Sequence, residues 1–166
     1  TVPTAPEALQ DLMELGLTEI IAPEFDAMVG VEQGNFHHLD VWEHSLLVIR
    51  NTWSVLDGSC PSLTLVLAAL LHDVGKPPTR MVDVESRTRF FGHEDVGAKM
   101  AEGILRRLKF SEREIEPVAK LVRNHMRLGS SPTFTKPAAR RVLRDLGDQV
   151  ENLLILVEAD CRSLKP

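Results

Sequence analysis

The chain has few cysteines, no run of apolar residues long enough for a membrane span and no excess of positive charge. Its 166 residues include only two cysteines, Cys60 and Cys161, which do not form a CxxC pair. We therefore expect two buried thiols in a reducing compartment, the cytoplasm, rather than a disulfide. The formal net charge of -5 at pH 7 argues against a protein that coats nucleic acid generally.

Signals for a membrane or for secretion are also missing. The apolar run 63–71 is about half the length of a bilayer span, and the amino end lacks a basic region followed by an apolar segment. The chain starts at Thr1 and stops soon after Asp160, so one expectation is a processed or excised part of a longer protein.

What the sequence does contain is helical periodicity, without internal repeats or low-complexity segments. It predicts one all-α domain, 1–166, with an amino-terminal helical segment at 1–30 and a core at 40–163. Helices are expected at 7–15, 20–29 with a break at Pro23, 41–56, 63–72, 94–108, 111–128, 136–146 and 148–162. Their expected caps are Asp40, Ser62, Ser111 and Asp148 at the start, and Gly129 and Gly147 at the end. Segments 80–84 and 87–91 could pair as a small β-hairpin.

Several polar side chains fall on the apolar faces of these helices. At 3.6 residues per turn His44 shares a face with Val41 and Val48, and both His125 and Asp160 lie on apolar stripes of their own helices. An unpaired buried carboxylate is costly, so Asp160 needs a cation, an Arg or Lys, or several hydrogen-bond donors.

A shared metal ion would satisfy these groups together. The candidate ligands follow one another at intervals that suit a site built from several helices: His44, His72, Asp73, His93, His125 and Asp160. Imidazole and carboxylate ligands favour one or two divalent ions of Mn, Fe, Co, Ni, Zn or Mg over calcium.

Each residue alone also has an ordinary explanation. His44 and His125 could be hydrogen-bonded core histidines, and Asp160 could pair with a buried arginine. His93 could be a surface cap. A third overall interpretation, a helical protein with satisfied histidines and no metal, needs a separate explanation for every one of these residues. The pair His72-Asp73 is harder to explain by packing, because it closes an apolar helix just before Gly75 and Lys76.

The order of these residues resembles the HD-domain metal-dependent phosphohydrolase superfamily. The resemblance rests on His44, on Leu-Leu-His72-Asp73-Val-Gly-Lys76 and on the distant Asp160. Other segments are more narrowly similar to the HD region that follows the nucleotidyltransferase head in bacterial CCA-adding and poly(A)-polymerase-like proteins: Gly34-Asn-Phe-His37-His38, Asp40-Val-Trp-Glu-His44, Phe91-Gly-His-Glu94 with Gly97-Ala98, and Leu121-Val-Arg-Asn-His125. Residues 1–30 resemble the segment that joins head and HD region. The head, with its Gly-Ser signature and paired carboxylates, is absent, so nucleotide addition is not expected of this chain.

The resemblance implies roles for individual residues. It assigns His44, His72, Asp73 and Asp160 to a first metal ion, with Asp73 able to bridge to a second, and His93 and His125 match ligands of the two-metal branch. It implies that a metal-bound water attacks phosphorus, with His72 and Asp73 at the catalytic centre.

Basic residues near these motifs are candidate phosphate ligands. Lys76 could act in catalysis and bind a substrate phosphate, or it could be a solvated loop lysine. Arg123 and Arg127 flank His125, and a second basic group is formed by Arg140, Arg141 and Arg144. We expect one group to rim the pocket and at least one to be plain surface. His37 and His38 are expected to face solvent or a ligand entrance.

The resulting expectation is a hydrolase of a phosphomonoester or phosphodiester, in a nucleotide or at an RNA end. The alternative is a noncatalytic module of a tRNA nucleotidyltransferase or poly(A)-polymerase-like protein. Such a module would position RNA or form a homodimer, and its metal would only hold the helices together.

Overall fold

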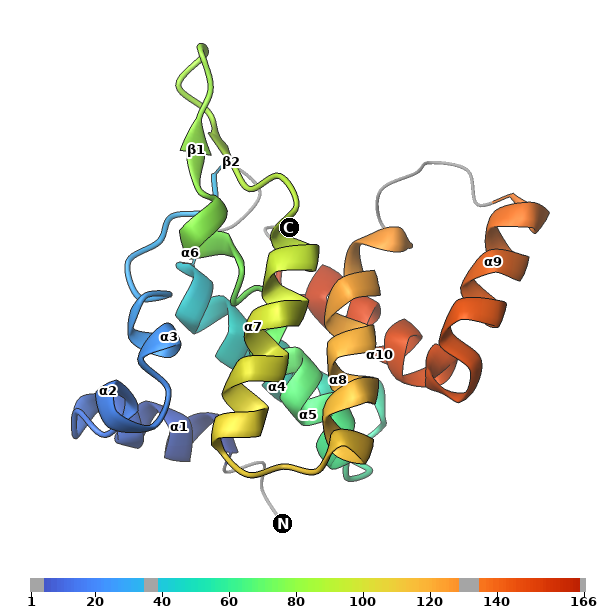
Figure 1. Ribbon diagram of the computed structural model, residues 1–166, viewed down its shortest axis with the longest axis horizontal. Coiled ribbons are helices and arrows are strands. Elements are labelled where there is room, and N and C mark those ends of the chain that lie inside the picture. Colours follow the sequence, from blue (N-terminus) through green and yellow to red (C-terminus); the bar gives the residue numbers. More distant parts are fainter. Residues whose placement is uncertain (1–4, 35–38, 129–134, 165–166) are drawn as a thin grey trace.

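The computed structural model describes residues 5–34, 39–128 and 135–164, and it confirms an all-α fold with one small hairpin (Figure 1). Its helices are α1 (Ala5–Glu14), α2 (Thr18–Ile21), α3 (Pro23–Asp26), α4 (Val41–Val55), α5 (Leu63–Leu71), α6 (Lys76–Thr79), α7 (His93–Arg107), α8 (Glu112–Asn124), α9 (Lys136–Leu146) and α10 (Val150–Cys161). Short 3-10 helices, His125–Arg127 and Gly147–Gln149, follow α8 and precede α10. None of the helices in the described ranges is long and apolar enough to cross a membrane.

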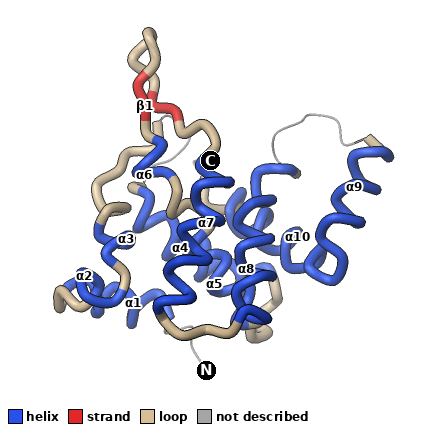
Figure 2. The backbone as a smooth tube through the Cα atoms, viewed as in Figure 1, coloured by secondary structure: helices blue, strands red, loops and turns tan. Residues whose placement is uncertain are grey.

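The apolar helix α5 lies at the centre of the bundle, as its composition predicts. Leu65, Ala68 and Leu71 are buried within a core that extends to α4, α7, α8 and α10. Helices α7 and α8 form the most extensive helix pair, and α4 and α10 pack together behind them (Figure 1). Helix α9 stands to one side of this bundle and returns to it through α10 (Figure 2). Helices α4, α8 and α10 therefore all pack against α5.

The predicted hairpin is present but short. Strand β1 (Met81–Val82) pairs antiparallel with β2 (Thr88–Arg89), and the pair projects from the bundle above α6 and α7 (Figure 2). Gly92 follows with φ 73°, a left-handed conformation that glycine adopts without strain, and the chain then enters α7. Because of this turn, His93 becomes the first residue of α7 and points inward.

Most of the predicted helix starts and stops are confirmed. The Asp40 side chain accepts from the Glu43 amide, Ser62 caps α5 in the same way through the Leu65 amide, and Ser111 forms a capping box with Glu114. Gly147 ends α9 with φ 58°.

Other expectations about these ends are wrong or fall outside the described residues. Asp148 does not cap α10, because the helix starts one residue later, after Gln149, and a 3-10 turn occupies the junction. Thr135, which was not predicted as a cap, caps α9 through the Ala138 amide. Gly129 lies outside the described residues, as do His37 and His38.

The expectation of two buried thiols is also wrong. Cys60 and Cys161 are free, as expected, but both are exposed. Cys60 lies in the loop before α5, and Cys161 is the last residue of α10, so neither sits on the buried face that its apolar neighbours suggested.

Candidate metal centre

The structure brings all six predicted ligand-type residues to one place. His44 comes from the first half of α4, His72 and Asp73 from the turn after α5, His93 from the start of α7, His125 from the 3-10 turn after α8 and Asp160 from the end of α10. They form two neighbouring groups that could each hold a metal ion, His44 with His72 and Asp160, and Asp73 with His93 and His125. Within each group the ligand atoms lie within 4.8 Å of one another.

Asp73 belongs to the second group but also faces the first. Its Oδ2 is 3.1 Å from His72 Nε2 and 3.6 Å from His44 Nε2. Its Oδ1 is 3.4 Å from His93 Nε2 and 3.7 Å from His125 Nε2. The carboxylate therefore faces one group with each oxygen, an arrangement that suits an aspartate shared by two cations.

Backbone hydrogen bonds fix the orientation of three of the imidazole rings. The Nδ1 atoms of His72, His93 and His125 lie 2.8, 2.8 and 2.7 Å from the carbonyl oxygens of Ala69, Phe90 and Val122. A carbonyl oxygen can only accept, so each Nδ1 carries a proton and donates it. When such a ring is neutral, this tautomer presents an Nε2 lone pair to the site, as in histidines that bind metal.

The contacts among these atoms fit a cation. The Nε2 atoms of His93 and His125 are 3.3 Å apart, and two lone pairs cannot hydrogen-bond to each other. Asp73 Oδ1 is buried and accepts no hydrogen bond within the described residues. A buried polar atom without a partner is costly, and a divalent ion would satisfy several such atoms at once. The residues present therefore fit one or two divalent metal ions.

Asp160 completes the first group from the rim. Its Oδ1 lies 3.0 Å from His44 Nε2, and its side chain is 27% exposed. No arginine within the described residues forms an ion pair with it, so the alternative of a buried Asp160–Arg pair is wrong. His93 is buried, so the alternative of a surface cap is also wrong.

The environment sets the protonation of this centre. Burial, reinforced by the charge of His72, lowers the pKa of His125 to about 4. Burial opposes ionisation of Asp73, but His72 and Lys76 hold the pKa of its carboxyl well below the usual range. Burial also lowers the pKa of His72, but the adjacent Asp73 outweighs it and raises that pKa above the usual value. An ionised Asp73 and a neutral His125 are the forms that bind a metal ion, whereas a proton on His72 would compete with it.

An open cavity of about 590 Å³ gives access to the centre. Its walls contain Asp73, His93, His125 and Asp160 together with Lys76 and residues of the hairpin side, Thr88, Arg89, Phe90 and Phe91. Lys76 is buried and donates to Asp73 Oδ2 at 2.7 Å and to Gln33 Oε1. The interpretation of Lys76 as a solvated loop lysine is therefore wrong. Sequence patterns gave no signal for Gln33 or Arg89, because both lie outside the helices that carry the ligands.

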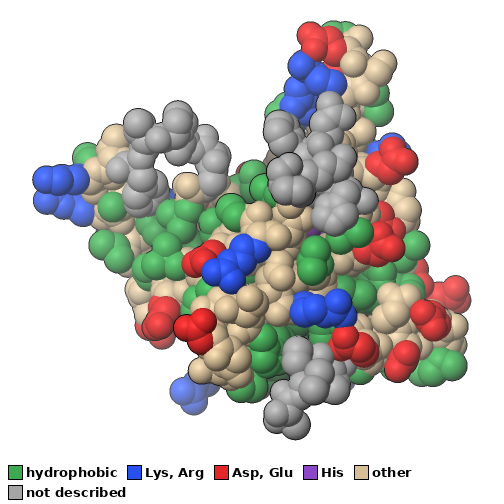
Figure 3. Space-filling model, turned by 180° about the vertical axis from the view of Figure 1, so that it is seen from behind, with side chains coloured by type: hydrophobic (Ala, Val, Ile, Leu, Met, Phe, Trp, Pro, Cys, Tyr) green, Lys and Arg blue, Asp and Glu red, His purple; other side chains and the backbone are tan. Residues whose placement is uncertain are grey.

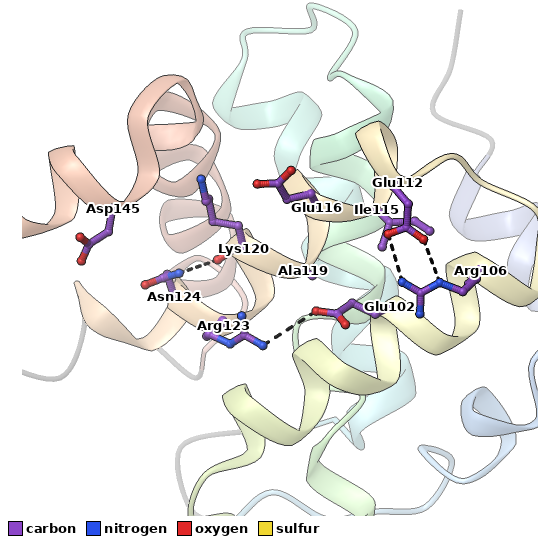
Figure 4. Close-up of a pocket in the computed structure, with 10 residues that line it drawn as sticks. All are labelled: Glu102, Arg106, Glu112, Ile115, Glu116, Ala119, Lys120, Arg123, Asn124 and Asp145. Carbon is purple, nitrogen blue, oxygen red and sulfur yellow. Dashed lines mark hydrogen bonds and ion pairs between the residues drawn. The ribbon is translucent and has the colours of Figure 1, made fainter.

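Arg123 and Arg127 lie apart from this cavity. Arg123 points toward Glu102 across a surface hollow between α7 and α8, as Figure 4 shows, and it also pairs with Asp95 at 3.4 Å. Arg127 donates to Asp145 Oδ2 at 3.1 Å. Both border a second hollow that shares Phe90, Phe91, His93 and Met126 with the metal cavity. The second basic group, Arg140, Arg141 and Arg144, lies on α9. Arg144 is exposed and pairs with Asp145, and none of the three borders the metal cavity among its described lining residues.

The sequence is similar to those of known proteins. A family model described as HD domain matches residues 41–163. The chain belongs to the HD domain family. This HD domain is 42% identical over 161 residues to a CC-adding tRNA nucleotidyltransferase of Thermus thermophilus and 36% identical over 163 residues to an A-adding tRNA nucleotidyltransferase of Deinococcus radiodurans. A bifunctional uridylyltransferase/uridylyl-removing enzyme of Ruegeria pomeroyi is 28% identical over 181 residues.

These relatives are much longer than the HD domain described here. Each of the two tRNA nucleotidyltransferase alignments covers 95% of this chain but 36% of the relative, and the third covers 96% of this chain and 19% of the relative. The resemblance to the HD region of tRNA nucleotidyltransferases is thereby confirmed.

Proposed function

We propose that this HD domain hydrolyses a phosphomonoester or phosphodiester of a nucleotide or an RNA end with one or two divalent metal ions. The observation that carries the proposal is the position of Asp73. It faces two metal-type groups and borders an open cavity, and the buried cation of Lys76 is 2.7 Å away. An open position at a metal site is typical of catalysis rather than of structural support.

Each residue has a role in this proposal. His44, His72 and Asp160 would hold one cation, His93 and His125 would hold a second, and the Asp73 carboxylate could serve both. A cation bound there would lower the pKa of a water ligand and neutralise charge on the phosphoryl oxygens. Lys76 binds a phosphoryl oxygen from the cavity wall. In the reaction the water oxygen forms a bond to phosphorus, the ester P–O bond breaks, and the alcohol leaves with a proton.

The nucleotide or RNA part of the proposal draws on the relatives, two of which are named for tRNA. The formal net charge of -5 at pH 7 does not favour a broad nonspecific nucleic-acid surface. On the face seen in Figure 3, lysine and arginine side chains are scattered singly among apolar and acidic ones.

A noncatalytic module is the second candidate function. The observation that favours it is that the same two relatives are named for adding nucleotides and are 36% covered by this chain. In that case the HD domain would position RNA, contact a nucleotidyltransferase head or form a homodimer, and any bound metal would hold the helices together.

The test combines metal content with turnover. Protein purified without chelator is analysed by elemental mass spectrometry, and hydrolysis of a phosphomonoester and a phosphodiester is measured after addition of manganese, nickel, cobalt or magnesium. We expect bound metal and metal-dependent turnover, both lost in His72→Ala and both retained in Asp148→Asn, which alters an exposed carboxylate. Bound metal without turnover on any substrate would favour the noncatalytic module. Absence of both would contradict the metal-centre assignment.

A further inference from the structure

The cavity beside the metal centre is bordered by cationic side chains that do not belong to the ligand set. Among the described residues, two charged side chains other than the candidate metal ligands border this cavity. They are Lys76 and Arg89. Both are cations. Within the described residues no acidic side chain outside the ligand set borders the cavity, although Arg89 pairs with Asp83 of the hairpin. The part of the cavity wall that Lys76 and Arg89 form is therefore suited to a substrate with additional negative charge.

The two cations occupy different positions in this wall. Lys76 is 8% exposed and contacts Asp73, at the depth of the metal centre. Arg89 is on strand β2, its side chain is 40% exposed, and its Nε donates to Asp83 Oδ2 at 3.2 Å. This contact uses the Nε atom of the guanidinium and ties the Arg89 side chain, which borders the cavity, to the hairpin. The two terminal nitrogens of Arg89 make no hydrogen bond within residues 5–34, 39–128 and 135–164, and they could form the paired hydrogen bonds that arginine makes with phosphate.

Two aromatic residues follow Arg89 directly. The Phe90 ring lies 5.6 Å from Lys76 Nζ, and the Phe90 carbonyl accepts from His93, so this residue links the hairpin to the metal centre. Phe91 borders the cavity but is 73% exposed. A large exposed aromatic ring beside a cationic pocket is suited to stacking with a nucleobase.

The adjoining hollow offers a weaker anion site. It contains Arg123 and Arg127, but Glu94 and Asp95 border it as well, so its formal charges cancel. The charge distribution thus favours the hairpin side of the cavity over the arginines of the α8 side.

We propose that Arg89 is a substrate-binding residue that holds a second phosphate group of a nucleotide, while Phe91 contacts the base next to it. The inference rests on the proposed function, because the first phosphate is the one at the metal centre. Its ligand class is a nucleoside that carries two separate phosphates, either as a free nucleotide or as the last residue of an RNA strand.

The test uses the full chain with excess manganese and four probes: adenosine 3′-monophosphate, adenosine 3′,5′-bisphosphate, the dinucleotide ApAp and ribose 5-phosphate, which lacks a base. For probes that are not turned over, calorimetry gives the dissociation constant. For probes that are turned over, KM is compared instead. Arg89→Ala is compared with Arg87→Ala, a matched control, because Arg87 also pairs with Asp83 but does not border the cavity. Phe91→Ala is compared with Val84→Ala, which alters an exposed apolar residue at the hairpin tip.

We expect Arg89→Ala to weaken the bisphosphate about tenfold or more, the usual effect of losing hydrogen bonds to a charged group. The monophosphate should change by less than about twofold, and Arg87→Ala should leave both probes unchanged. Phe91→Ala should weaken adenosine 3′,5′-bisphosphate about fivefold to a hundredfold, but not ribose 5-phosphate, and Val84→Ala should have no effect. ApAp binding more tightly than the bisphosphate would identify a strand end, and equal binding would identify a free nucleotide.

Two results would overturn the inference. One is a bisphosphate that binds no more tightly than the monophosphate, and the other is an equal effect of Arg89→Ala and Arg87→Ala. Failure of the proposed function is distinguishable, because it would leave Arg89-dependent binding without hydrolysis of any probe.

Discussion

Gly75 and Gly97 meet backbone to backbone where the turn after α5 crosses the first turns of α7. A methyl group at Gly75 would lie 2.6 Å from the Gly97 amide nitrogen and would also overlap the carbonyl oxygen of His93. This contact sets how closely the Asp73 turn approaches His93, and therefore how the two groups of ligands are spaced.

Gly75→Ala should therefore damage both stability and the metal centre. We expect a loss of about 1–3 kcal/mol in the free energy of unfolding, because the backbone must shift to admit the methyl group. Metal affinity should fall in parallel. Chemical denaturation and metal titration measure the two effects. The matched control is Gly103→Ala within α7, where nothing lies within 4 Å of the added carbon and a gain of about 0.4–1 kcal/mol is expected. Equal effects of the two substitutions would contradict this account.

Asp73→Asn should abolish metal binding while preserving the shape of the side chain. The substitution removes the negative charge that faces both ligand groups, and its effect on metal affinity should exceed the roughly 10–100-fold that loss of a supporting contact causes. Elemental mass spectrometry of the purified variant and its turnover with added manganese provide the measurement. Full metal content in this variant would show that Asp73 is not shared by the site.

Lys76→Gln separates phosphate binding from metal binding. Lys76 contacts Asp73 but belongs to neither ligand group, so we expect the metal to remain while KM for a phosphate ester rises about tenfold or more. Steady-state kinetics on metal-loaded protein measures this. Lys99→Gln, an exposed position on α7, serves as the control. If Lys76→Gln loses metal, while the fraction that still holds metal keeps the KM of the parent chain, the lysine supports the metal ligands instead.

The hairpin should respond to acid at an unusually low pH. Asp83 accepts hydrogen bonds from the amides of Arg87 and Glu85 and from the side chains of Arg87 and Arg89, and the Arg87 amide contributes most to lowering its pKa to about 2. Since the pKa is lower in the folded hairpin than in the unfolded chain, the stabilisation is complete above about pH 4 and is lost as the pH falls through about 2.

Nuclear magnetic resonance of the Glu85 and Arg87 amides between pH 7 and pH 1.5 tests this expectation. Their signals should shift with a midpoint near pH 2 in the parent chain, and this transition should be absent in Asp83→Asn. A midpoint near pH 4 would mean that the hairpin does not hold the carboxylate.

The positions of the helices were predictable because their signals are local. Asp40, Ser62 and Ser111 cap the helices that follow them, and the apolar faces of α4 and α10 already placed His44 and Asp160 toward the interior. The junction before α10 was not predictable in this way. Asp148 is a residue type that often caps helices, but the 3-10 turn Gly147–Gln149 contains it, and α10 begins only at Val150.

The sequence by itself determined the all-α class and the set of six ligand-type residues, because periodicity and residue chemistry are properties of short segments. Only the tertiary structure decided that Asp73 faces both groups, that Lys76 is buried beside it and that Arg89 rather than Arg123 borders the cavity. These relations join elements that are far apart in the chain, and a helical pattern gives the face of a residue but not the partner it meets. The exposure of Cys60 and Cys161 was decided in the same way, by where the helix ends lie relative to the core.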